Sequence, residues 1–257
     1  MVKGLYTAYT GMLNQQNKVD VIANNLANAA TTGFKKEGST SEAFDAVLAH
    51  KIKDQTSAAR AKYIGTMNLG VKIGENYVDY SQGAFETTDN TYDLALSGDG
   101  FFCVEFTNKA GETSTKYTRD GSFTLNVDGY LVTKDGDYVL DQSGKHIKLD
   151  PLADARIDES GTIYQNDRAA ARIGLQDFED YNYLEHYGEN YYQPVDGATP
   201  TTSNAQIFEG YLETSNVQVV KEMVELISAT RTYESNQKVL QTIDETLDTA
   251  VNQLGKV

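Results

Sequence analysis

Apolar residues near the start of the chain recur at every seventh position. This row, with its companions three positions later, comprises Leu5, Met12, Val19 and Leu26 together with Ala8 and Ile22. Such spacing places the side chains along one stripe of a helix, as in the seam of a coiled coil. No proline interrupts the segment. We therefore expect a long amphipathic helix over residues 1–30.

The other end of the chain repeats the pattern over a longer stretch. Its row consists of Val219, Leu226, Tyr233, Leu240, Leu247 and Leu254, accompanied by Ala229, Ile243 and Ala250. Glu222 and Asn236 interrupt the companion row. Ser215 and Asn216 are residue types that cap helix N-termini. We expect a second helical segment over 215–257.

A seam of apolar residues needs a partner, and each end of the chain can supply the other's. Residues 1–30 and 215–257 are therefore expected to form a long α-helical coiled-coil pair. Away from its seam the first helix carries amides in place of charges, at Asn14, Gln15, Gln16, Asn17, Asn24, Asn25 and Asn28. Because buried charges are costly, neutral amides favour a helix that is crowded on several sides.

In the middle of the chain, short apolar runs alternate with turn signals. Asp-Gly pairs occur at 99–100, 120–121, 128–129 and 135–136, and Ser-Gly pairs at 143–144 and 160–161. Each pair can supply the positive φ that a tight hairpin needs. The spacing predicts a mostly β domain over 71–210, folded as a sandwich or an irregular barrel. Residues 31–70 are interpreted as a polar linker with some helical character, and 180–205 as extended loop.

Charge and hydropathy exclude several partners. The 257-residue chain has a net charge of −15 and a pI of about 4.6. An acidic surface repels phosphate backbones, so we expect no nucleic-acid partner. No stretch approaches 18 apolar residues, so no transmembrane segment is expected. No apolar core follows Lys3, which argues against a cleaved secretory signal.

Residues suited to catalysis or metal binding are few and scattered. The histidines, His50, His146 and His186, lack metal-ligand spacing. The only cysteine, Cys103, lies in an apolar run that favours an inert thiol. We therefore expect no catalytic residue, no metal and no cofactor. The tyrosine-rich segment 181–192 is consistent either with a surface for sugars or other subunits or with ordinary packing.

Distinct blocks of sequence lie at residues 20–28, 32–35, 98–102, 117–123, 210–217, 222–224 and 231–234. In their residues and their order, these blocks resemble those of the flagellar basal-body rod and hook proteins. The signature residues among them are Asn24, Asn25, Leu26, Asn28, Gly33, Phe34, Ser215, Asn216 and Val217. Thr230 and Thr232 depart from the family's usual Gln and Ala. Within the family, length and the blocks at 98–123 are most similar to the distal-rod member, with the proximal-rod member second.

The resemblance implies a non-enzymatic axial subunit of the bacterial flagellar rod. Such a subunit is exported from the cytoplasm through the flagellar type III apparatus, without a Sec signal. With copies of itself and other rod and hook proteins, it forms a hollow helical tube that transmits torque from motor to hook. The residues expected to pack within the assembled helices are Leu5, Met12, Val19, Ile22, Leu26, Leu226, Tyr233, Leu240, Ile243, Leu247 and Leu254. The alternatives are a secreted adhesin with a coiled-coil stalk and a secreted glycan-acting enzyme.

Overall fold

The computed structural model describes residues 2–51, 62–109, 111–188 and 190–252. The chain folds into two compact units, each discontinuous in sequence. Unit 1 combines residues 1–26, 37–79 and 218–257, and unit 2 combines residues 27–36 and 80–217. The chain therefore passes from one unit to the other four times. None of the helices in the described ranges is long and apolar enough to cross a membrane.

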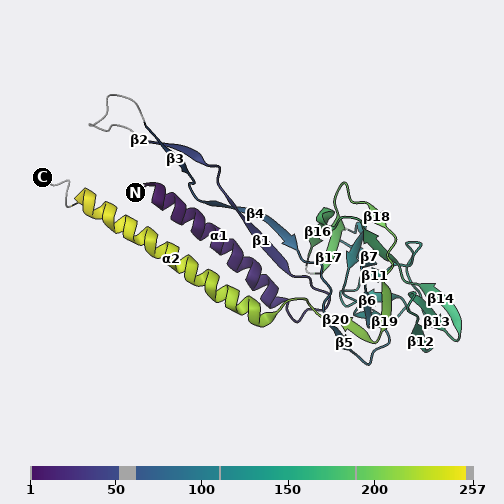
Figure 1. Cartoon of the computed structure of the whole chain (residues 1–257). Coiled ribbons are helices and arrows are strands. Elements are labelled where there is room, and N and C mark those ends of the chain that lie inside the picture. The colour runs from purple at the N-terminus through teal and green to yellow at the C-terminus, as the bar shows by residue number, and fades with distance from the viewer. Residues whose placement is uncertain (1, 52–61, 110, 189, 253–257) are drawn as a thin grey trace. The chain divides into compact units, whose positions relative to one another are not determined.

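Unit 1 consists of two long helices and two antiparallel ribbons (Figure 1). The helices are α1 (Val2–Ala27) and α2 (Val219–Asn252); β1 (Glu37–Ala43) pairs with β4 (Val71–Val78), and β2 (Val47–Lys51) with β3 (Lys62–Met67). Both helices predicted from the seven-residue rows are confirmed. Helix α2 begins three residues after Asn216, so the predicted N-cap at Ser215 and Asn216 is wrong.

Helices α1 and α2 pack side by side, and two glycines of α1 face residues of α2. A methyl group added at Gly4 would lie 3.8 Å from Ile243 Cδ1, and one at Gly11 would lie 3.1 Å from Asn236 Nδ2. The seven-residue step between the glycines matches an equal step in the opposite direction between their neighbours. The two helices are therefore antiparallel. That they supercoil as a coiled coil remains a prediction.

The β1–β4 ribbon and the residues just before β4 contact α1 on another side. Thr7 Oγ1 donates a hydrogen bond to the Leu69 carbonyl at 3.3 Å, and Ser41 Oγ donates to Asn14 Oδ1 at 3.0 Å. Asn14 is only 8% exposed. Helix α1 therefore has neighbours on two sides. Amide side chains such as that of Asn14 form hydrogen bonds with residues of the strands.

The expected linker over 31–70 is wrong, because β1, β2 and β3 lie within it. The ribbon is mostly exposed, so β1 has the sequence Glu-Gly-Ser-Thr-Ser-Glu-Ala and lacks the apolar alternation that marks a half-buried strand. The expected start of the β domain at residue 71 is also too early. Strand β4 belongs to unit 1, and unit 2 resumes at residue 80.

Unit 2 is mostly β, as expected, but its strands form open sheets. The largest sheet has the order β16 (Leu184–Tyr187), β17 (Tyr191–Pro194), β8 (Thr113–Thr118), β7 (Phe101–Thr107), β11 (Tyr138–Val139), β10 (Leu131–Thr133) and β9 (Phe123–Leu125), with β15 (Leu175–Phe178) also on β7 and β18 (Pro200–Thr201) on β15. No sheet closes among the described residues, so the barrel alternative is wrong. The expected loop over 180–205 contains the β16–β17 hairpin.

Smaller sheets complete unit 2. They join β12 (Ala155–Ile157), β13 (Thr162–Gln165) and β14 (Arg168–Arg172); β6 (Leu94–Ser97) and β19 (Gln206–Glu209); and β5 (Phe85–Thr87) and β20 (Tyr211–Glu213). A short 3₁₀ helix spans Tyr181–Tyr183. The core of the unit gathers apolar residues from several of these sheets. Leu94, Leu96 and Phe102 at its centre are fully buried.

The Asp-Gly and Ser-Gly pairs mostly form turns as expected. Glycines with positive φ are Gly100, Gly129, Gly136, Gly144 and Gly161. Gly121 is the exception, because its φ is not positive and a Cβ there would lie 1.7 Å from the Leu94 carbonyl oxygen. Glycine is therefore required at position 121 because another chain segment passes close to it, and not because a turn needs a positive φ there.

We expect Leu96→Ala to lower the free energy of unfolding by about 2–5 kcal/mol, because it leaves a cavity in a packed core. Leu152→Ala makes the same chemical change at a side chain that is 97% exposed, and should have little effect. Urea denaturation followed by tyrosine fluorescence measures both variants. Equal losses would contradict the placement of Leu96 at the centre of the core.

Candidate functional site

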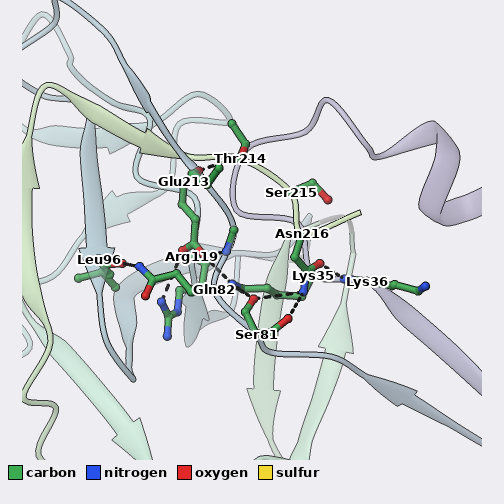
Figure 2. Close-up of polar contacts among 12 residues, drawn as sticks. Lys35, Lys36, Ser81, Gln82, Leu96, Arg119, Glu213, Thr214, Ser215 and Asn216 are labelled. Atoms are coloured by element: carbon green, nitrogen blue, oxygen red, sulfur yellow. Dashed lines mark hydrogen bonds and ion pairs between the residues drawn. The ribbon is translucent and has the colours of Figure 1, made fainter. Parts of the chain in front are cut away.

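Segments from both ends of the chain meet in unit 2 around one carboxylate, that of Glu213 (Figure 2). Glu213 ends β20, and Lys35 lies on the segment that follows α1, 178 residues away in sequence. Their side chains are 0% and 2% exposed. Removing a charge from water is costly unless partners replace the lost hydration. Both residues therefore depend on the groups packed around them.

Three donors share the Glu213 carboxylate. Oε1 accepts hydrogen bonds from Lys35 Nζ at 2.6 Å and from the Gly83 backbone N–H at 2.8 Å. Oε2 lies 3.5 Å from Arg119 Nη1. Lys35 Nζ also donates to the Ser81 carbonyl at 2.9 Å. We call Glu213, Lys35 and Arg119 the buried ion cluster.

Arg119 brings a second cation into the buried ion cluster. Its Nη2 donates a hydrogen bond to the Gly98 carbonyl at 2.8 Å, and its guanidinium lies 5.3 Å from the centre of the Phe101 ring. The side chain is 3% exposed. The one Glu213 carboxylate faces two cations. The Gly98 carbonyl and the Phe101 ring therefore help to stabilise the charge of the Arg119 guanidinium.

Asn216 binds the same region through its amide. Its Oδ1 accepts a hydrogen bond from the Lys36 backbone N–H at 2.8 Å, and its Nδ2 donates to the carbonyl of Ser81 at 3.1 Å and to its hydroxyl at 3.0 Å. The neighbouring Ser215 hydroxyl accepts from the Val217 N–H at 3.3 Å. Asn216 therefore joins three chain segments, which is a different role from the helix cap expected for it.

Gly33 and Phe34 shape the segment that carries Lys35. Gly33 has a φ of +71°, its N–H donates to the Glu213 carbonyl at 2.8 Å, and a Cβ on it would lie 2.4 Å from the Asp120 nitrogen. Only glycine fits both the backbone angle and the space. Phe34 is 1% exposed and meets the His186 ring edge to face, with centroids 6.5 Å apart.

In unit 1, the Asn25 side-chain amide forms two hydrogen bonds with the backbone of Glu37. Its Nδ2 donates to the Glu37 carbonyl at 2.8 Å, and its Oδ1 accepts from the Glu37 N–H at 2.9 Å, as a paired strand would. Nδ2 also lies 3.4 Å from Glu222 Oε2 on α2. Asn24 reaches the Glu37 carboxylate at 3.4 Å, and Asn28 Oδ1 accepts a hydrogen bond in the turn after α1. Asn25 therefore positions the start of β1.

The predicted seam residues lie along the less exposed stripe of each helix. Ile22 is buried, at 4% exposure. The half-buried members are Leu5, Met12, Val19, Leu26, Leu226, Tyr233, Leu240, Ile243 and Leu247. Leu254 lies outside the described residues. Glu222 and Asn236, which interrupt the row in sequence, share the same stripe, and Glu222 is 1% exposed.

The residues considered for chemistry do not converge. His146 Nε2 lies 3.2 Å from Glu105 Oε1, and its ring stacks on Tyr138. The His50 side chain is outside those described. Within the described ranges, no group of three or more His, Cys, Asp or Glu could hold a metal ion. Burial raises the pKa of the Cys103 thiol to about 12, which keeps it protonated near neutral pH.

Three family models match the chain. Residues 5–35 match the flagella basal body rod protein model, 95–165 the D1 domain of the flagellar hook proteins FlgE/F/G, and 209–254 the C-terminal model of the flagellar basal body rod FlgEFG proteins. Lys35 closes the first matched stretch, Arg119 lies in the second and Glu213 in the third. The buried ion cluster thus joins one residue from each.

Several flagellar proteins are similar over their full length. The basal-body rod protein FlgF of Caulobacter vibrioides is 36% identical over 259 residues, with 100% of both chains covered. The rod protein FlgG of Bacillus subtilis is 36% identical over 275 residues, covering 98% of this chain and 99% of the relative. The hook-basal body complex protein FlhO of Bacillus subtilis is 31% identical, with 100% of both chains covered. Equal identity to differently named rod proteins leaves the choice among rod members a prediction.

Lys35→Met should lower the free energy of unfolding of the chain by about 1.5–3 kcal/mol, because the Glu213 carboxylate loses its shortest charge-assisted hydrogen bond while Arg119 and the Gly83 N–H remain beside it. Lys72→Met is the matched control. Lys72 pairs with Glu42 at 2.7 Å, but both side chains are more than half exposed, so little or no change is expected. Urea denaturation of the two variants measures the difference. A loss no larger at Lys35 than at Lys72 would refute a structural role for the cluster.

Cys103 should resist alkylation in the folded protein. At pH 8 a pKa near 12 leaves roughly a thousandfold less thiolate than an ordinary cysteine has. Iodoacetamide labelling at pH 8, followed by mass spectrometry, should be at least ~100-fold slower in the folded chain than in urea. The rate should climb as the pH approaches the raised pKa. Labelling at the unfolded rate would contradict a packed, inert thiol.

Proposed function

Because the chain belongs to the flagellar basal-body rod protein family, and is thus a structural protein of the flagellum that serves motility, we propose that it polymerises through its two terminal helices. The product is a hollow axial rod that transmits torque from motor to hook. The partners in this assembly are copies of the chain itself and other rod and hook proteins.

The observation that carries this proposal is the apolar surface that both helices leave exposed. On α1 it consists of Tyr6, Tyr9 and Leu13, and on α2 of Val220, Met223, Val224 and Ile227. Each set repeats at helical spacing and so forms a stripe. Val220 is 77% exposed and Val224 is 62% exposed. Soluble monomers rarely expose large contiguous apolar patches, so these stripes favour burial in an assembly.

A second copy of the chain is the occupant that fits the stripes. The α1 and α2 stripes have different residues and lie on different helices, so contact between them on successive subunits is heterologous. Heterologous contacts that do not close into a ring generate helical filaments. The seam residues, from Leu5 to Leu247, would then hold each helical pair together while the outer stripes join neighbouring pairs.

Export and the absence of catalysis complete the proposal. We propose that the chain leaves the cytoplasm through the flagellar type III apparatus, independently of a Sec signal, as the family resemblance implies. Isolated helices are marginal in water, which favours passage of the terminal segments unfolded. We also propose that the chain is not an enzyme and needs no cofactor. The family's structural role supports this, as does the scatter of candidate residues such as His146 and Cys103.

The alternatives from the sequence have no comparable support. The matches are to flagellar rod and hook proteins along the whole chain. They do not support a secreted adhesin with a coiled-coil stalk or a secreted glycan-acting enzyme.

Ile227→Asp and Leu240→Asp should distinguish the exposed stripe of α2 from its seam. Ile227 is 54% exposed, so its variant should unfold within about 0.5 kcal/mol of the parent. It should nevertheless lose rod assembly and swimming, because the charge would be buried between subunits. Leu240→Asp should lose helix stability as well, since Leu240 is half-buried in the seam.

Ser228→Asp is the matched control, because it adds the same charge at the next exposed position of α2. Soft-agar swimming with each variant as the only copy, and circular dichroism of the purified chains, are the measurements. Normal swimming with Ile227→Asp would show that the exposed stripe is not an assembly surface.

A further inference from the structure

The exposed face of α2 changes character along the helix. Residues on it at intervals of seven are Val224, Arg231, Lys238 and Glu245, and all four are exposed. Positions seven apart lie on the same side of a helix, so this face passes from apolar to basic to acidic. Residues 241–252 contain three carboxylates and no lysine or arginine. Opposite charges are therefore separated along one side of one helix.

These charges form no ion pairs within the described part of the chain. The residues concerned are Arg231, Lys238, Glu245 and Asp248. Asp248 follows Asp244 by four residues and Glu245 by three, and like charges at these spacings destabilise a helix. A cation supplied by another molecule would relieve that repulsion.

The pairing of α1 with α2 gives both helices a common axial scale. Gly4 faces Ile243 and Gly11 faces Asn236, so residues at the same level of the two helices have numbers that add to 247. On this scale the exposed stripe of α1 lies level with residues 234–241 of α2 in the same copy. The positions of the two stripes can therefore be compared directly.

The apolar stripes define an offset between neighbouring copies. Subunits of a helical filament share one polarity, so α1 of one copy runs antiparallel to α2 of the next. When the two stripes pack together, Tyr6 lies opposite Ile227 and Leu13 opposite Val220. Residue 241 of one α2 is then level with Ile227 of the next. The offset is 14 residues, which is about 21 Å along the helix axis.

The same offset brings the acidic end of one α2 level with the basic part of the next. Glu245 falls level with Arg231, and Asp248 lies about one turn from both Arg231 and Lys238. Glu234 is the one opposing charge on that part of the face. The stripes that define the offset contain none of these charges, so the match between charges is an independent observation.

Other offsets of whole heptads agree less well with the sequence. With no offset, Glu245 of one copy would lie level with Glu245 of the next, and like charges would meet. With one heptad, the α2 stripe would face residues 13–20 of α1, which include Lys18 and Asp20. With three heptads, Glu245 would lie level with the apolar Val224. At two heptads, apolar residues meet apolar residues and opposite charges meet.

We propose that Glu245 pairs with Arg231 of a second copy of the chain, and that this pair sets a two-heptad offset between neighbouring α2 helices. The proposal rests on assembly through the terminal helices and adds which parts of them meet. An exposed ion pair contributes little affinity by itself. Registers that bring like charges together are nevertheless strongly disfavoured. The apolar stripes thus supply most of the affinity, and the charges help to select one register.

The first test is charge reversal in the full chain, with each variant as the only copy. Glu245→Arg and Arg231→Glu should each reduce the soft-agar swimming zone at least about twofold, because like charges then meet at every contact between copies. The double variant restores opposite charges and should recover most of the parental zone. Glu245→Arg combined with Lys221→Glu is the matched control and should not recover, since Lys221 is exposed on α2 at a different level.

Cross-linking measures the offset without reversing a charge. Chains carrying Glu245→Cys and chains carrying Arg231→Cys are co-expressed, and isolated basal bodies are treated with a short bismaleimide. The two positions lie about 21 Å apart along one helix, so a product must join two copies. The raised pKa of the Cys103 thiol keeps it from competing. Lys238→Cys in place of Arg231→Cys reports an offset of one heptad.

Recovery by the double variant together with a 245–231 product supports the pairing. The proposal is overturned if either single reversal swims as the parent does, if the double variant stays as impaired as the single ones, or if the product forms through position 238 and not 231. Should circular dichroism show that a reversal unfolds the purified chain, the cross-link decides. Loss of swimming with Ile227→Asp but with neither reversal would sustain assembly through the helices and refute only this register.

Discussion

The buried carboxylate of Glu213 is the constraint on which unit 2 depends. It is acceptable in the interior only while Lys35, Arg119 and the Gly83 N–H surround it. Lys35, Gly83 and Glu213 each lie within five residues of a point where the chain passes between the units. The buried ion cluster therefore fixes the chain on the unit 2 side of three of the four points where it passes between the units.

Polar residues inside the helical pair follow a similar logic. Glu222 and Asn236 interrupt the apolar row, yet both lie on the same stripe as the row, and Glu222 meets Asn25 across the pair. A polar residue in such a seam lowers stability but penalises every register in which it lacks its partner. Gly11 adds a steric condition, because it leaves space where Asn236 approaches. Together these residues specify one antiparallel register, which a purely apolar seam would specify less well.

Local patterns predicted the elements, and long-range contacts account for what they missed. The seven-residue rows located α1 and α2, and most Asp-Gly and Ser-Gly pairs proved to be turns with positive φ. The β1–β4 ribbon was missed because an exposed strand needs no apolar alternation. Lys35 and Glu213 look like ordinary surface charges in the sequence, and only the fold brings them together. Gly121 could not be separated from the turn glycines, since its neighbour Leu94 is distant along the chain.

The separation of Lys35 from Glu213 also has a kinetic consequence. Closing a loop of 178 residues carries an entropic cost before any contact compensates for it, and this cost favours formation of the ion cluster late in folding. When the chain emerges with its N-terminus first, Lys35 cannot pair with Glu213 until residue 213 has also emerged. Until then Lys35 stays hydrated, although Phe34 beside it can already pack on His186. Residue 213 lies close to the end of unit 2, so the buried ion cluster can form only after nearly all of the unit has emerged.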